Sequence, residues 1–141
     1  MQFRRFGNKY FVRMDRGEEI MASLEEFCIT ERITLAEVKA LGAVDDFSVG
    51  LFDVDSKEYH ANHFEFPAEI VSLWGTVTTK EGKPYLHIHM SAADEKGQVW
   101  GGHLNTARVS ATCEMIVDVV DGKVERKFDE DVGLNLFHFV D

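Results

Sequence analysis

Cysteine and proline are both rare in this chain of 141 residues, with two of each. Cys28 and Cys113 are too few for a disulfide framework, and each lies within an apolar pattern, as a small core residue would. No run approaches the roughly 18 apolar residues that a membrane helix needs, and no apolar signal segment follows Met1. We therefore expect a single domain over 1–141, located in the reducing cytoplasm and without a membrane partner.

Positive charge is also scarce. Lys and Arg total 15 against 25 Asp and Glu, so the formal net charge is -10. Such a surface repels phosphate backbones unless basic residues cluster. The basic pairs, Arg4 with Arg5 and Arg126 with Lys127, are typical of solvated strand ends. The composition therefore disfavours unaided nucleic-acid binding.

Several motifs of catalysis are missing as well. The sequence has no phosphate-binding loop, no Gly-x-Gly-x-x-Gly, no Gly-x-Ser-x-Gly nucleophile elbow and no Cys-x-x-Cys. Nucleotide hydrolysis and serine or thiol-redox chemistry are therefore disfavoured.

What the sequence does contain is mostly strand signal. A helix is predicted over 18–31, where Ile20, Leu24 and Phe27 recur at helical spacing. Turn-forming segments between the apolar runs favour antiparallel hairpins. Strands are predicted over 9–14, 33–41, 47–54, 59–66, 69–78, 85–91, 99–104, 107–120 and 134–140. We expect an α+β fold with a mainly antiparallel sheet, packed by one long N-terminal helix and short helical pieces.

Three of the six histidines form a pattern. His87 and His89 lie two residues apart in a strand, so both imidazoles point to one face of the sheet. His103 ends the strand after the next hairpin turn, and an antiparallel return brings it alongside His89. The glycines before it, Gly101 and Gly102, leave room where the backbone approaches a ligand closely.

Three imidazoles without a fourth protein ligand are typical of an open zinc site, so we predict that they bind zinc or another divalent transition metal. The alternative is that the rings are half-exposed and bonded to neighbours. His60 and His63 are spaced three apart and are interpreted as surface residues, and His138 as a strand-edge residue.

Several segments of the sequence resemble the plants-and-prokaryotes conserved (PPC) domain family in its stand-alone prokaryotic form. The most specific match is the ordered pair of motifs Leu-His-Ile-His at 86–89 and Gly-Gly-His-Leu at 101–104. Further matching segments are 10–19, 40–44 and 66–75. The resemblance implies a compact α+β fold, homotrimers, and a metal held by His87, His89 and His103. It also carries a DNA-binding label, which derives largely from plant members with an AT-hook, and this sequence contains no Arg-Gly-Arg-Pro core.

Three functional hypotheses stay open. The first is a trimeric metal-binding module of gene regulation that recognises a small ligand at the open metal position, or a protein partner. The second is a zinc-dependent enzyme using a metal-bound water, for which Glu65, Glu69, Asp94 and Glu114 are candidate acids or bases. The third is direct DNA binding. The apolar side chains of Phe64, Phe66, Ile70, Leu73 and Trp74 serve either the core or a subunit interface.

Overall fold

The computed structural model describes residues 1–140, most of which are in strands. The elements in chain order are β1 (Gln2–Phe6), β2 (Lys9–Asp15), α1 (Ile20–Thr30), β3 (Ala36–Asp53), β4 (Glu58–Phe64), β5 (Ala68–Lys80), β6 (Lys83–Ala93), β7 (Val99–Val119), β8 (Glu125–Asp129) and β9 (Leu134–His138). The sheet order is β1-β2-β7-β3-β5-β8-β9, with β4 beside β3 and with β6 pairing both β5 and β7. The strands pair antiparallel, apart from one parallel bridge between β5 and β8.

The expected packing by one long N-terminal helix and short helical pieces is wrong. Strands hold 66% of the residues and helix holds 8%. The helix α1 has 11 residues, and residues 1–140 contain no second one. Segments expected to interrupt the sheet instead continue it, because β3 and β7 pass through them with β-bulges. At one such bulge a Cβ on Gly42 would lie 2.1 Å from the Thr112 carbonyl oxygen, so glycine allows the two strands to meet.

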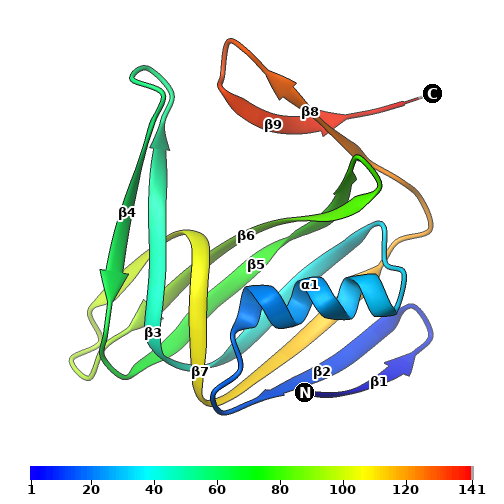
Figure 1. The fold of residues 1–141 in the computed structure, drawn as a ribbon. Helices are drawn as coiled ribbons and strands as arrows, with labels where there is room; N and C mark the ends of the chain where they lie inside the picture. The colour runs from blue at the N-terminus through cyan, green and yellow to red at the C-terminus, as the bar shows by residue number, and fades with distance from the viewer. Residues whose placement is uncertain (141) are drawn as a thin grey trace.

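Helix α1 nevertheless lies where its periodicity predicts. The Glu19 side chain caps it by accepting hydrogen bonds from the backbone N–H groups of Met21 and Ala22. Its buried face carries Ile20, Leu24, Phe27 and Cys28. Figure 1 shows the helix lying across one face of the sheet, where these side chains help to form the core.

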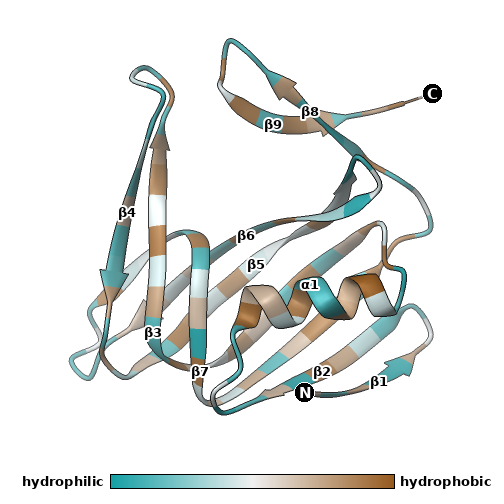
Figure 2. Cartoon of the chain, in the orientation of Figure 1, coloured by the Kyte–Doolittle hydropathy of each residue, from teal (hydrophilic) through white to brown (hydrophobic). Residues whose placement is uncertain are grey.

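The strands contribute the rest of the core by alternation. In β2, Tyr10, Val12 and Met14 are buried while the residues between them are exposed. In β6, Ile88 and Met90 point into the core, so His87 and His89 point out of the opposite face. Apolar and polar segments accordingly alternate along β3 and β7 in Figure 2, whereas the exposed β4 is mostly polar.

Two hairpins extend beyond the main sheet, with β5 and β6 between them (Figure 1). Their tips touch, because the Lys57 amine of the β3–β4 hairpin donates a hydrogen bond to the Asp131 carbonyl in the β8–β9 turn. A Cβ on Gly133 in that turn would approach the Phe52 ring to 3.2 Å. Within the described chain, no helix has the length and apolar character required to cross a bilayer.

Candidate metal centre

The three histidines singled out by their spacing come together on the outer face of β6 and β7. His89 pairs directly with His103 across the two strands, and His87 lies two residues earlier on β6. The ring centroids are 5.1 Å apart for His87 and His89, 5.4 Å for His87 and His103, and 5.7 Å for His89 and His103. One nitrogen from each ring lies within 4.8 Å of the other two. Since zinc binds imidazole nitrogen at about 2.0–2.1 Å, small ring rotations suffice to share one ion.

Glycines allow the strands to approach closely at this point. A Cβ on Gly102 would lie 2.5 Å from the Gly50 carbonyl oxygen of β3, and one on Gly101 would lie 2.8 Å from the Met90 carbonyl oxygen of β6. Both contacts are too short for any larger residue. The glycine pair thus fixes the position of His103 through backbone contacts, and it also lines a shallow groove beside His89.

A tyrosine that the sequence analysis did not single out supports His103. The ring of Tyr59, on β4, packs edge-on against the His103 imidazole with centroids 6.0 Å apart. Its hydroxyl donates a hydrogen bond of 2.9 Å to the Asn105 side chain. No local pattern marks Tyr59, because the contact depends on the pairing of β4 with β3 and of β3 with β7.

The surroundings keep two of the imidazoles neutral. Desolvation, together with the charges of His89 and Arg126, lowers the pKa of His87 to about 4. Desolvation and His89 also lower the pKa of His103 below its usual value. At pH 7 both rings therefore carry a free nitrogen lone pair, which is the form that binds a metal.

None of the candidate acids and bases joins the three-histidine group. The Asp94 carboxylate accepts hydrogen bonds from the backbone of Lys96 and Gln98 within a turn. Glu114 lines a groove beside Ile116, and Glu69 follows the start of β5. Within residues 1–140, no Asp, Glu or Cys joins the three histidines in a group of converging ligand atoms.

The other three histidines are exposed, and for His60 and His63 this agrees with the interpretation from their spacing. His63, however, has partners that the sequence analysis did not predict: its Nε2 lies 2.8 Å from Asp46 and 3.8 Å from Glu65. The hydrogen bond to Asp46 raises the pKa of His63. His138 ends β9, and His60 lies in β4.

One basic residue is placed very differently from the expected solvated strand end. Arg126, in β8, is only 9% exposed, whereas its neighbour Lys127 is exposed. Arg126 packs against the outer face of β5 and β6, beyond His87. The prediction of two solvated basic side chains is therefore wrong for the first of the pair.

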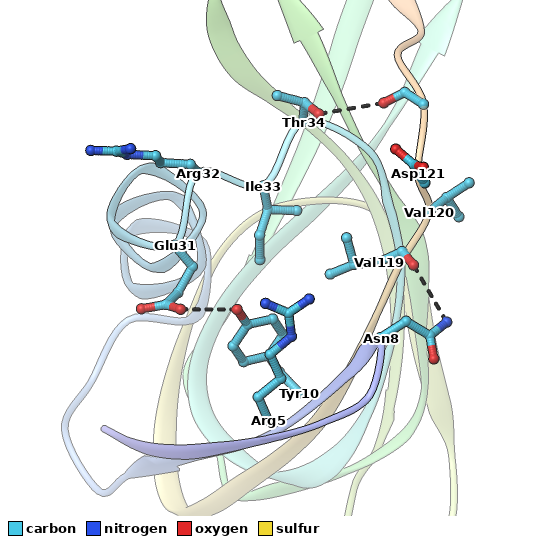
Figure 3. A pocket seen from close by; sticks show the side chains of 11 residues that line it. Arg5, Asn8, Tyr10, Glu31, Arg32, Ile33, Thr34, Val119, Val120 and Asp121 are labelled. Atoms are coloured by element: carbon cyan, nitrogen blue, oxygen red, sulfur yellow. Dashed lines mark hydrogen bonds between the residues drawn. The ribbon is translucent and has the colours of Figure 1, made fainter.

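A separate hollow lies between the end of α1 and the β1–β2 hairpin (Figure 3). There the Tyr10 hydroxyl donates a hydrogen bond of 2.9 Å to Glu31, and the Arg5 guanidinium lies 5.4 Å from the Tyr10 ring centroid. None of the predicted site residues lines this hollow. The three-histidine group is therefore the site that the sequence and the structure have in common.

A β-rich fold with three converging histidines on its outer face can be compared with known proteins. The family model described as the Plants and Prokaryotes Conserved (PCC) domain matches residues 1–121. The chain belongs to this family, as its motifs predicted.

Solved structures match almost the whole chain. A metal-containing protein from Archaeoglobus fulgidus is 35% identical, with 99% of each chain covered and a TM-score of 0.87. A plant- and prokaryote-conserved (PPC) protein from Pyrococcus horikoshii is 31% identical, covering 99% of this chain and 96% of that one, with a TM-score of 0.86. A protein from Bacteroides thetaiotaomicron, provisionally named as DNA-binding, is 27% identical with coverages of 98% and 96% and a TM-score of 0.96.

One curated relative is much longer. The chain is 26% identical over 132 residues to the bifunctional protein GlmU of Synechococcus sp. (strain JA-3-3Ab). The match covers 92% of this chain and 20% of that protein, so the chain spans about a fifth of its relative's length.

Proposed function

We propose that this protein is a metal-binding module in which His87, His89 and His103 hold one zinc ion, or another divalent transition metal, and leave one position open for a small ligand. The observation that carries the proposal is the convergence of three imidazole nitrogens to within 4.8 Å of one another. The metal-containing relative from Archaeoglobus fulgidus supports it. Neutral imidazoles are ligands that suit zinc, copper, nickel and iron alike.

The test is metal content and coordination. The chain, purified without added chelator and dialysed, is expected to retain about one zinc per chain by elemental analysis. Replacement of zinc by cobalt is expected to give the intense visible absorption of a four-coordinate ion. A protein that takes up no metal from a zinc-containing buffer would contradict the proposal.

We further propose a homotrimer of a single domain over 1–141. The outer face carries Leu41, Val71 and Trp74, each at least half exposed, and these side chains line one groove with Ile116. Trp74 pairs directly with His89, so the apolar groove borders the proposed metal site. Exposed apolar patches of this kind favour subunit contacts. Light scattering should give three times the 16.0 kDa chain mass, and a monomer mass would exclude the trimer.

Direct DNA binding is the second candidate, supported by the provisional name of the Bacteroides relative. Its basic surface would be the β1–β2 hairpin, which carries Arg4, Arg5 and Arg13. The net charge of -10 opposes it, and Arg13 is already paired with Asp15. Retardation of duplex DNA at low salt, lost in Arg4→Ala with Arg5→Ala, would support this role, and an unshifted duplex would exclude it.

A zinc-dependent enzyme is the third candidate, because an open position on zinc can activate a water molecule. A chelator-sensitive turnover of ester, phosphate or lactone substrates would favour it over a binding module. The two free, buried cysteines fit a reducing compartment such as the cytoplasm, where we propose that the protein acts.

A further inference from the structure

Arg126 is a buried cation with no acidic partner among residues 1–140. Its guanidinium donates through Nε to the Thr78 hydroxyl at 3.0 Å and through Nη1 to the Asn135 carbonyl oxygen at 3.1 Å. A third, longer contact of 3.4 Å runs from Nη2 to the Thr76 hydroxyl. All three acceptors are neutral. Across residues 1–140, no carboxylate forms an ion pair with Arg126.

A charge in this position is costly unless something pairs with it. Removing a cation from water disfavours the charged form, and buried arginines are therefore usually paired with acids. Desolvation lowers the pKa of Arg126 for the same reason. Arginine remains protonated in proteins, so no carboxylate of the described residues balances the positive charge at this point.

The guanidinium also keeps capacity for a ligand. Two aromatic rings pack against it, with the carbon atom Cζ 4.3 Å from the Phe137 centroid and 4.9 Å from the Tyr85 centroid. Further polar contacts of the guanidinium are made through its N–H groups. Three of the five N–H groups have acceptors, which leaves two to bind an oxyanion.

Asn135, whose backbone carbonyl accepts from Arg126, carries a second polar group without a partner among the described residues. The side-chain oxygen of Asn135 is buried and accepts no hydrogen bond within the described part of the chain. The amide nitrogen of the same side chain is 3.4 Å from the Tyr85 hydroxyl. Buried polar atoms are almost always paired, and an amide oxygen is an acceptor, so the missing partner of Asn135 must carry a donor such as a hydroxyl group.

These groups adjoin the three histidines. Thr76, which accepts from Arg126, is the direct cross-strand partner of His87, and Thr78 is the partner of Tyr85. Directly opposed residues of antiparallel strands share a face and have Cβ atoms about 4.5–5.5 Å apart.

The nearest acidic side chain on this face by register has other partners. Glu37 pairs with Thr76 from the far side, on β3. Its carboxylate accepts a hydrogen bond of 2.6 Å from the Trp74 indole and lies 3.0 Å from the Lys39 amine. A metal ion on three neutral imidazoles would add positive charge beside Arg126 without an acid between them.

We propose that Arg126 is the anion-binding half of a ligand site whose other half is the metal held by His87, His89 and His103. The ligand is a small molecule that carries an oxyanion, either a carboxylate or a phosphate, bound by the free N–H edge of Arg126. The inference rests on the proposed metal site, and it names the chemical class of ligand for the open position. Arg126 lies beyond the residues that the family model matches, so this half of the site belongs to the C-terminal hairpin.

The experiment is calorimetric titration of the zinc-loaded protein with glycolate, malonate and inorganic phosphate, at constant ionic strength. Arg126→Met removes the charge and keeps an apolar chain beside the Tyr85 and Phe137 rings. Arg126→Lys keeps the charge and loses the planar N–H fork. The matched control is Lys127→Met, because Lys127 is the adjacent cation on the same strand and is exposed.

At least one of the three anions is expected to bind the wild type and Lys127→Met equally, and to bind Arg126→Met at least tenfold more weakly. Arg126→Lys is expected to fall between them. The anion that binds identifies a carboxylate or a phosphate as the ligand. A cooperative melting transition of Arg126→Met verifies that the variant is folded. The same anion should raise the melting temperature of the wild type but not that of Arg126→Met.

Two failures are distinguishable. If the wild type takes up no zinc, the metal site is wrong and this inference falls with it. If zinc binds at one ion per chain, but no anion binds or Arg126→Met binds as tightly as the wild type, the metal site stands and the role of Arg126 is overturned.

Discussion

His89 and His103 are direct cross-strand partners where β6 pairs with β7, and their ring centroids are 5.7 Å apart. The pair contributes two of the three imidazoles, so the loss of either ring leaves only two ligands for the metal. The first prediction concerns the loss of one of them. His89→Ala leaves two imidazoles, and we expect the zinc affinity to fall well over tenfold in a titration against a competing chelator.

The matched control for this variant is His60→Ala, which removes an exposed histidine on β4 that is outside the three-histidine group. Its zinc affinity should equal that of the wild type. If His89→Ala keeps the wild-type metal content after dialysis, the ion is held by residues other than the three histidines.

The second prediction concerns the close approach at Gly102. In Gly102→Ala the new methyl group would lie 2.5 Å from the Gly50 carbonyl oxygen, so β7 must move away from β3. We expect a loss of about 1–3 kcal/mol in the free energy of unfolding, together with weaker zinc binding, because His103 follows directly. Denaturant unfolding of the metal-free protein measures the first effect separately from the second.

Gly122→Ala is the control for that substitution, since a Cβ there meets nothing closer than 3.4 Å, at a Leu35 methyl group. It should unfold at nearly the wild-type denaturant concentration. Equal stability of the two variants would mean that β7 can move away from β3 at Gly102 with little loss in the free energy of unfolding.

The third prediction concerns pH. The hydrogen bond to Asp46 raises the pKa of His63 above its ordinary value near 6.5. Protonated His63 therefore stabilises the folded chain fully below the unfolded pKa of about 6.5, and this contribution is lost as the pH rises through the folded value. An NMR titration of the His63 ring protons should give a midpoint above 6.5. In Asp46→Asn the midpoint should move down, and an unmoved midpoint would exclude Asp46 as the cause.

The fourth prediction concerns the cysteines. Burial raises the pKa of the Cys28 and Cys113 thiols to about 12, so the nucleophilic thiolate is almost absent at pH 8. We expect a chromogenic disulfide reagent to leave both thiols unmodified in the native protein and to modify both after denaturation. Rapid labelling of the native protein would show that the core opens far more easily than its packing indicates. The same shift implies that the contribution of these two thiols to folding stability is fully present below the unfolded pKa of about 8.5 and is lost progressively at higher pH.

Much of the fold follows from local patterns. The helix over 18–31 and the hairpins were predictable because burial imposes a period of 3.6 on α1 and of two on the strands. The amount of helix outside α1 was not predictable in this way. Bulges carry β3 and β7 through segments that resemble turns, and whether a bulge or a break occurs there depends on the neighbouring strand.

By itself, the sequence determined the relation of the three histidines. His87 and His89 share a face because strand side chains alternate, and the short turn at 94–97 returns His103 beside His89. Only the tertiary structure decided the surroundings of that group. Arg126 reaches Thr78, 48 residues earlier, and Tyr59 reaches Asn105, 46 residues later. Such contacts leave no periodicity in the chain, because they depend on how distant strands pair and not on how neighbouring residues alternate.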